Sequence, residues 1–202
     1  MEVPNTLTLC IDNRERTTWR PKFPPTLEWW DQQQKPRLLT IKQDECHLVS
    51  GDYLFREFAD VTRIERKKDL AELDQNFMSA RDGARWGRCW AKFQKSCLVP
   101  IVWIGMPDSS LRPMLPSGHA PGAVWSTVLR TFLAAGVQLI VSIDPTTRSA
   151  KQRAIYQYFW GEFLLHCMLG VIAAYNPPTE GSQHDRKDNR TNHPPPGKEV
   201  AG

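Results

Sequence analysis

Two apolar runs in the second half of the chain constrain its fold more than any other feature. Residues 98–104 and 137–143 are short and apolar and are bounded by turn residues, a pattern typical of strands buried on both faces. Helices are predicted at 80–96, at 124–135 and from 146 to about 169. Strands that alternate with helices predict an α/β protein with a mixed sheet flanked by helices.

The N-terminal segment contains a clear strand pattern. Residues 6–11 alternate and are rich in β-forming residues, so we expect a strand that ends at Asp12. A stretch rich in Trp, Pro and Gln follows, and we expect a short helix at 25–33 because Pro24 and Pro25 are suitable helix openers.

Three further β-rich segments precede residue 70. A second short strand is expected at 37–42. Residues 53–58 and 61–66 predict a hairpin that turns at 59–60. The first strands are therefore expected to be mostly antiparallel.

Length and composition indicate one domain with a polar tail. The 202 residues suit a single domain, expected at 1–175, and residues 176–202 are too polar to bury a core, so we expect disorder there. The five cysteines are odd in number and form no CxxC pair, which excludes a zinc ribbon or a thioredoxin motif and favours reduced, buried thiols. Neither a signal sequence nor a membrane-length apolar run is present. We therefore expect an intracellular protein, in the cytoplasm of a bacterial or phage-infected cell or in a eukaryotic nucleus.

Acidic and basic residues gather at the ends of the predicted strands, in the segments 12–15, 51–53 and 64–67. If the hairpin turns at 59–60, Asp52 lies across from Glu65 within about one residue of register. Glu65 and Lys67 are two apart and share a strand face. Asp12, at the end of the first strand, can join them.

Such a cluster suits phosphodiester hydrolysis. Carboxylate oxygens hold a hard divalent cation such as Mg²⁺, which also takes a substrate phosphate oxygen. The cation lowers the pKa of a bound water and neutralises developing charge. A neighbouring lysine can orient the attacking water and stabilise the transition state. The alternative interpretation is a charged strand edge that protects against aggregation.

The ordered motifs resemble the nuclease domain of the XPF/Hef family of structure-specific endonucleases. That family has Asp-x-Arg-Glu after its first strand, then Gly-Asp, Glu-Arg-Lys, and an Asp-Leu that opens a helix. The corresponding residues here are Asp12-Asn13-Arg14-Glu15, Gly51-Asp52, Glu65-Arg66-Lys67 and Asp69-Leu70. The resemblance continues more weakly to about residue 170.

The resemblance implies a restriction-endonuclease-like fold and a metal-dependent endonuclease that cuts branched, flap or junction DNA and leaves 5′-phosphate and 3′-hydroxyl ends. It implies that Asp52, Glu65 and the backbone carbonyl of Arg66 bind Mg²⁺, for which Mn²⁺ would substitute. Asp12 would complete the acidic patch as a further metal ligand, and Lys67 would be the catalytic lysine.

Two departures from the family pattern stand out. Only Lys68 separates the Lys from the following Asp, where the family usually has three residues, and Asp69 with Glu72 fits a helix N-cap. No helix-hairpin-helix module follows residue 170, so DNA binding would fall to the nuclease domain, a partner or the tail.

The predicted helix at 80–96 carries a basic stripe. Its cations recur at spacings of four and three and lie opposite Trp86, Trp90 and Phe93. The cations of this basic stripe are Arg81, Arg85, Arg88, Lys92 and Lys95. The stripe is either an ordinary solvated face or a ridge that tracks DNA phosphates beside the active site. The predicted DNA-binding residues are Arg14, Arg66, Arg81, Arg85, Arg88 and Lys92.

Two alternatives of function remain open. One is a catalytically idle subunit that binds DNA and scaffolds an active partner, although such subunits typically lose the acidic and lysine residues kept here. The other is a junction resolvase or exonuclease on the same fold. By resemblance, and from the apolar surface expected at 156–165, we also expect a homodimer or heterodimer through the nuclease domain.

Overall fold

The computed structural model describes residues 2–15, 20–31, 34–107, 114–144 and 149–175. The predicted disordered tail at 176–202 lies outside these residues. Within them, no helix has the length and apolar character needed to cross a membrane.

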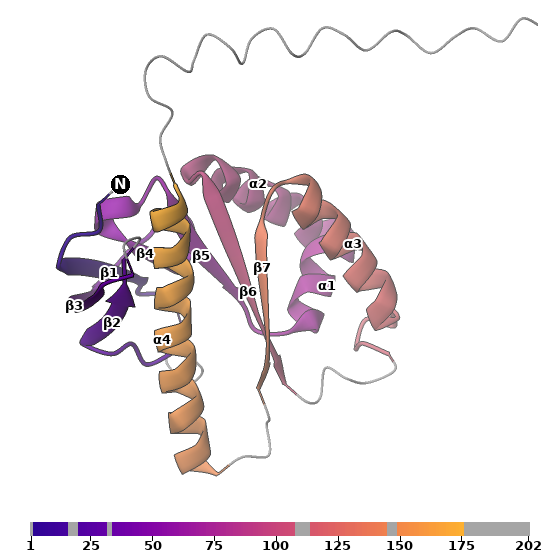
Figure 1. Ribbon diagram of the computed structural model, residues 1–202. Helices are drawn as coiled ribbons and strands as arrows, with labels where there is room; N and C mark the ends of the chain where they lie inside the picture. The colour runs from indigo at the N-terminus through magenta and orange to yellow at the C-terminus, as the bar shows by residue number, and fades with distance from the viewer. Residues whose placement is uncertain (1, 16–19, 32–33, 108–113, 145–148, 176–202) are drawn as a thin grey trace, which may run out of the picture.

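The described strands form one seven-stranded sheet in the order β2-β3-β1-β4-β5-β6-β7 (Figure 1). Their bounds are β1 Thr6–Asp12, β2 Thr26–Trp30, β3 Pro36–Cys46, β4 Tyr53–Phe55, β5 Thr62–Lys67, β6 Val99–Pro107 and β7 Gln138–Asp144. A 3-10 turn, Arg56–Phe58, links β4 to the segment before β5. The predicted mixed sheet is confirmed.

The pairing directions differ from the prediction at one place. β2 with β3, β1 with β4, and β4 with β5 are antiparallel, as expected for the first strands. However, β1 and β3 pair in parallel along the whole of β1, from Thr6↔Thr40 to Asp12↔Cys46. β5, β6 and β7 are also parallel to one another.

The helix predicted at 25–33 is wrong, because this segment forms strand β2. Its burial follows a period of two, with Leu27 buried between the exposed Thr26 and Glu28. Trp29 faces the core side and stacks on His166 at a centroid distance of 6.0 Å. β-branched and aromatic residues next to a long partner strand outweigh the two prolines, and that partner, β3, extends beyond the predicted 37–42.

In the described part of the chain, four α-helices cover the sheet: α1 Leu70–Met78, α2 Ala80–Ser96, α3 Pro121–Ala134 and α4 Ala150–Ala174. α4 lies along one face, and α1, α2 and α3 lie over the other (Figure 1). Local signals mark two helix ends. The predicted cap Asp69 accepts from the Glu72 amide at 2.9 Å at the start of α1, and Gly136 follows α3 with a φ of +68°.

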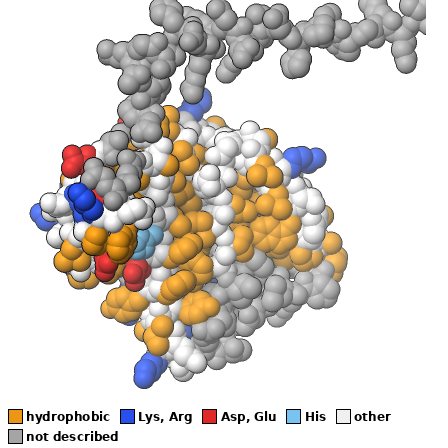
Figure 2. Space-filling model, in the orientation of Figure 1, with side chains coloured by type: hydrophobic (Ala, Val, Ile, Leu, Met, Phe, Trp, Pro, Cys, Tyr) orange, Lys and Arg blue, Asp and Glu red, His pale blue; other side chains and the backbone are white. Residues whose placement is uncertain are grey.

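Two large cores lie on opposite faces of the sheet. The first joins α4 to β1, β3, β4, β5 and β6, and the second joins α1, α2 and α3 to β6 and the start of β7. A small third cluster consists of Cys10, Leu48 and Leu54, on the face of β1 and β4 away from α4. In the view of Figure 2, hydrophobic side chains also remain on the surface along α4 and over α3.

Candidate active site

Three neighbouring strands bring the predicted acidic residues together. Ile11 pairs with Tyr53 and Tyr53 pairs with Ile64, and all three side chains are fully buried on the α4 face. The next position on each strand is Asp12, Asp52 or Glu65, and strand alternation turns these side chains to the opposite face. The predicted register of Asp52 against Glu65 is therefore confirmed.

Asp12 is held by Arg14 in the tight turn after β1. Its carboxylate accepts hydrogen bonds from the Arg14 amide at 2.9 Å, from Nε at 2.9 Å and from Nη2 at 2.5 Å. Burial alone would raise the pKa of Asp12, but the hydrogen bonds and charge of Arg14 outweigh it and the pKa is lowered. Asp12 is thus an ionised carboxylate, while the Arg14 side chain remains 60% exposed.

Asp52 is the carboxylate of the cluster whose pKa is raised. Burial raises its pKa well above the ordinary value, and the negative charges of Glu65 and Glu15 raise it further, against a 2.6 Å hydrogen bond from the Arg66 amide. Gly51, with a φ of +76°, precedes it, and a Cβ there would lie 3.2 Å from the Ile64 carbonyl oxygen. The close approach of β4 to β5 explains why glycine stands before this aspartate.

Lys67 is a buried cation held from several sides. Its Nζ lies 2.8 Å from Glu65 Oε1 and 3.5 Å from Glu72 Oε1, and 4.1 Å from the centre of the Trp86 ring. Burial would lower the pKa of Lys67, but Glu65 and Glu72 outweigh it, so the pKa is raised. The ammonium is therefore charged and fixed in position.

Arg66 points to the other face of β5. Its guanidinium bonds Glu15 Oε1 at 2.5 Å and lies 5.4 Å from the centre of the Trp103 ring. With a side chain only 11% exposed, it is placed to support the turn that carries Glu15, away from the solvent that a DNA contact requires. Its backbone amide, in contrast, is part of the acidic site through Asp52.

Sequence reasoning missed three contributors to this site, namely Glu15, Glu72 and Trp86. Glu15 stands in the first motif but was given no partner. Glu72 was interpreted only as half of a capping box, although it also accepts from the Lys68 amide at 2.8 Å. Trp86 belongs to the apolar stripe opposite the cations, and nothing in a helical stripe indicates that one ring faces a lysine.

The donor set fits a hard divalent cation. The negative charge of Glu65 raises the pKa of Asp52, and a cation between the two carboxylates removes this repulsion. With the Arg66 carbonyl, these residues would provide oxygen ligands of the kind Mg²⁺ prefers. Asp12 is less available to a cation than Asp52 and Glu65, because both of its carboxylate oxygens already accept hydrogen bonds from Arg14.

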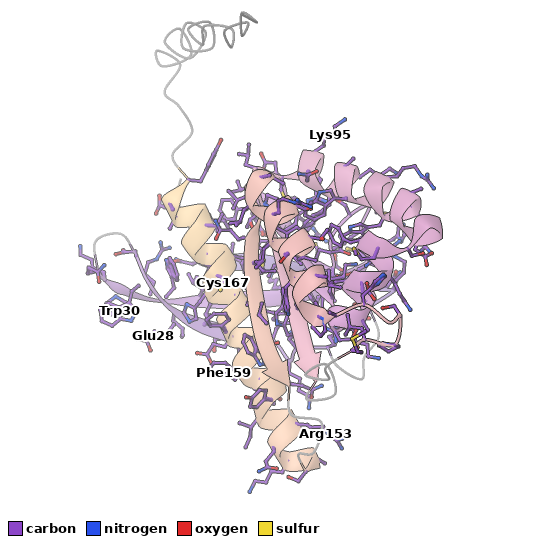
Figure 3. All side chains as sticks on the ribbon, turned by 90° about the vertical axis from the view of Figure 1, so that its right-hand side faces the viewer. Glu28, Trp30, Lys95, Arg153, Phe159 and Cys167 are labelled. Carbon is purple, nitrogen blue, oxygen red and sulfur yellow. The ribbon has the colours of Figure 1, made fainter. Side chains whose placement is uncertain are left out.

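The basic stripe on α2 faces solvent as predicted. Arg85, Arg88 and Lys92 are exposed, whereas Trp86 and Trp90 are 9% exposed and pack in the second core. Figure 3 shows Lys95, the last cation of the stripe, projecting from the end of α2. The side chain of Arg81 lies outside the described part of the structure.

The fold has counterparts among solved structures, although no protein-family model and no curated protein matches the chain. It is similar to XPF from Aeropyrum pernix, with a TM-score of 0.46 and 13% identity over 78% of this chain and 61% of that one. It is also similar to XPF from Aeropyrum pernix in complex with DNA, with a TM-score of 0.48 and 14% identity over 79% and 64% of the two chains. The chain thus spans less than two thirds of either solved chain.

Proposed function

We propose that this chain is a magnesium-dependent DNA endonuclease. One observation carries the proposal: a charged, immobilised Lys67 lies 2.8 Å from Glu65, on the same face of the sheet as the partly buried Asp52, which directly precedes β4. Buried charges of both signs are costly to keep in a protein unless they serve binding or chemistry. Carboxylates beside a fixed lysine suit attack of water on a phosphodiester.

Each residue has a role in this proposal. Asp52, Glu65 and the Arg66 carbonyl hold the cation, with Asp12 completing the acidic patch. When bound, Mg²⁺ supplies neutralisation of phosphate charge and acidification of a water, and Mn²⁺ is expected to substitute. Lys67 Nζ orients the attacking water and stabilises charge on the phosphoryl oxygens, while Glu72 and Trp86 keep it in place.

The expected reaction leaves 5′-phosphate and 3′-hydroxyl ends on DNA. Arg14, with its exposed guanidinium, is placed to contact a phosphate next to the site, and Arg85, Arg88 and Lys92 extend a positive surface along α2. Arg66 acts in this proposal through its backbone and through Glu15. The preference for branched, flap or junction DNA comes from the motif resemblance.

The test is cleavage of labelled flap, fork, four-way junction and blunt DNA, with Mg²⁺ or with EDTA. Asp52→Asn is the informative variant, because asparagine can still accept the Arg66 amide. Glu28→Gln is its control, since Glu28 is an exposed carboxylate on the edge strand β2, far from α2 in Figure 3. Metal-dependent cutting by the natural protein and Glu28→Gln, but not by Asp52→Asn, is the expected result, and unchanged cutting by Asp52→Asn would overturn the assignment.

The same panel separates the alternatives. Retention of Asp12, Asp52, Glu65 and Lys67 in one cluster favours an active enzyme over a scaffold subunit. Tight DNA binding without cutting under any metal would favour the scaffold. Loss of the end label without internal cuts would favour an exonuclease. Selective cutting of four-way junctions would favour a resolvase.

We further propose that two copies associate through α4. Ile155, Tyr158 and Phe159 are each more than half exposed, and Phe159 stacks on Phe163 at 6.1 Å on the surface. Figure 3 shows Phe159 on the outer side of α4. A dimer by sedimentation at micromolar concentration that dissociates in Phe159→Asp is expected, and a monomeric natural protein would refute this proposal.

A further inference from the structure

A second group of metal-binding side chains lies beside the acidic site on the sheet. Cys10 on β1 pairs in register with Asp44 on β3, and Cys46 is two residues further along β3, on the same strand face as Asp44. One donor atom from each of the three residues lies within 4.8 Å of the other two. Among the described residues, no other three His, Cys, Asp or Glu side chains gather their donor atoms so closely.

The surroundings of this group suit a bound ion. Cys10 is 3% exposed and packs with Leu48 and Leu54, which close the inner side. Asp44 and Cys46 are only partly buried, so the outer side is open to solvent. The group therefore combines an apolar inner side with two sulfur atoms and one carboxylate, and two of its three residues reach solvent.

We propose that Cys10, Asp44 and Cys46 form a second metal site, which binds a thiophilic divalent cation such as Zn²⁺. Two thiolates and one carboxylate are a ligand set for Zn²⁺, whereas Mg²⁺ takes oxygen ligands. Zn²⁺ holds sulfur at about 2.3 Å and carboxylate oxygen at about 2.0–2.2 Å in a tetrahedron, with water as the fourth ligand. On binding, both thiols release their protons to solvent, and no electron transfer is involved.

Arg56 occupies the mouth of the site when no cation is bound. Its Nη2 forms an ion pair with Asp44 Oδ2, and its side chain is 58% exposed. The guanidinium can swing into solvent and leave the Asp44 carboxylate to the cation. Arg56 therefore competes with the cation, and its removal should strengthen binding rather than weaken it.

The site is coupled to the acidic patch through the β1–β3 ladder. Asp12 pairs with Cys46, and the Asn13 amide donates to the Cys46 carbonyl at 2.9 Å. A cation that joins Cys10 to Cys46 would therefore clamp the strand end that presents Asp12 and Arg14.

The experiment uses Co²⁺ as a spectroscopic substitute. The full chain, reduced and freed of metal, is titrated with Co²⁺ and then with Zn²⁺ in the absence of DNA. We expect one equivalent of Co²⁺ to give a thiolate-to-cobalt charge-transfer band in the near ultraviolet and the visible bands of tetrahedral cobalt, both removed by Zn²⁺. Absence of the charge-transfer band in the natural protein would overturn the proposal.

Variants locate the site and separate it from the magnesium site. Cys10→Ser and Cys46→Ser should lose the band, and Cys89→Ser and Cys167→Ser should keep it, because Cys89 on α2 and Cys167 on α4 do not belong to this group of donor atoms. Asp52→Asn should also keep it, so the result stands apart from the nuclease assignment. A band that survives in both Cys10→Ser and Cys46→Ser would refute the site.

The Cys10→Ser variant could lose the band merely by misfolding, because Cys10 is buried. Two substitutions at solvent-accessible side chains therefore test the site independently. Asp44→Asn should weaken Co²⁺ binding at least tenfold, and Arg56→Ala should tighten it several-fold, with neither variant altering the near-ultraviolet circular dichroism of the metal-free protein. Equal affinity in both variants and the natural protein would contradict the proposed ligand and its competitor.

Discussion

The two halves of the sheet differ in how their faces are covered. β6 and the adjoining strands lie between helices, with Val102 and Ile104 fully buried under α1, α2 and α3, and Trp103 buried on the α4 side. Among the described residues, the half formed by β2, β3, β1 and β4 has α4 on one face and only the small cluster around Cys10 on the other. The acidic patch begins at β5, where the second helical layer ends. Burial on both faces therefore stabilises the half around β6, here called the covered half. In the other half, here called the half-open part, the described residues leave one face of the sheet available for polar chemistry.

The largest expected effect comes from detaching α4 from the half-open part. Gly161 lies so close to the chain at Lys22 that an added Cβ would be 2.1 Å from the Lys22 carbonyl oxygen. Gly161→Ala should therefore cost about 3 kcal/mol or more of the free energy of unfolding, measured by denaturant titration. Gly170→Ala is the matched control, because a Cβ there meets nothing within 4 Å, and it should stabilise α4 by about 0.5–1 kcal/mol. Similar stabilities for the two variants would contradict this packing.

The next effect tests whether Lys67, at the boundary between the two halves on β5, takes part in catalysis. Lys67→Met keeps the apolar stem against Trp86 but removes the ammonium that lies against Glu65. Loss of one transition-state donor should lower kcat by about 10²–10³-fold, measured in single-turnover cleavage. Lys35→Met, in the exposed connection between β2 and β3, should cleave normally. Full activity of Lys67→Met would show that Lys67 is not a catalytic lysine.

A smaller effect concerns stability and its dependence on pH. Because the folded-state pKa of Asp52 is raised above the unfolded value, folding favours its protonated form, and stability falls as pH rises through the folded pKa. In EDTA near neutral pH, Asp52→Asn should melt higher than the natural protein, by about 2–4 °C for each kcal/mol of repulsion relieved. The difference should vanish below the ordinary pKa of 3.8. A lower melting temperature for Asp52→Asn at neutral pH would show that the ionised Asp52 carboxylate does not destabilise the folded protein.

The smallest effect concerns the cations of α2, which belong to the covered half but face solvent. Replacing Arg85, Arg88 and Lys92 with Ala should lower the slope of log affinity against log salt by about 0.9 for each DNA phosphate that α2 no longer neutralises. Binding to flap DNA by fluorescence anisotropy at several salt concentrations measures this slope. An unchanged slope would mean that the stripe only solvates the helix.

Much of the covered half is predictable from sequence because local signals agree there. The bounds of α2, the cap at Asp69 and the stop at Gly136 follow from short-range patterns. The cluster of Asp12, Asp52 and Glu65 was also predictable, since strand alternation fixes which side chains share a face once the hairpin is placed.

The remaining features depend on pairings between distant segments, which local patterns do not contain. β2 is a strand because β3 lies beside it, and β3 runs parallel to β1 through a long connection. That parallel register is what brings Cys10 to Asp44, so neither residue could be singled out beforehand. Likewise, Trp86 meets Lys67 only through the packing of α2 on the sheet.

The alternation of β5 also limits how this gene can change in length. Ile64 and Arg66 face α4, while Glu65 and Lys67 face the acidic patch, so one inserted or deleted codon between Thr62 and Glu65 would exchange the two sets. Descendant sequences can therefore drift by substitution within β5 but can gain or lose residues only in the connections outside it, such as those near the outer edge at β2.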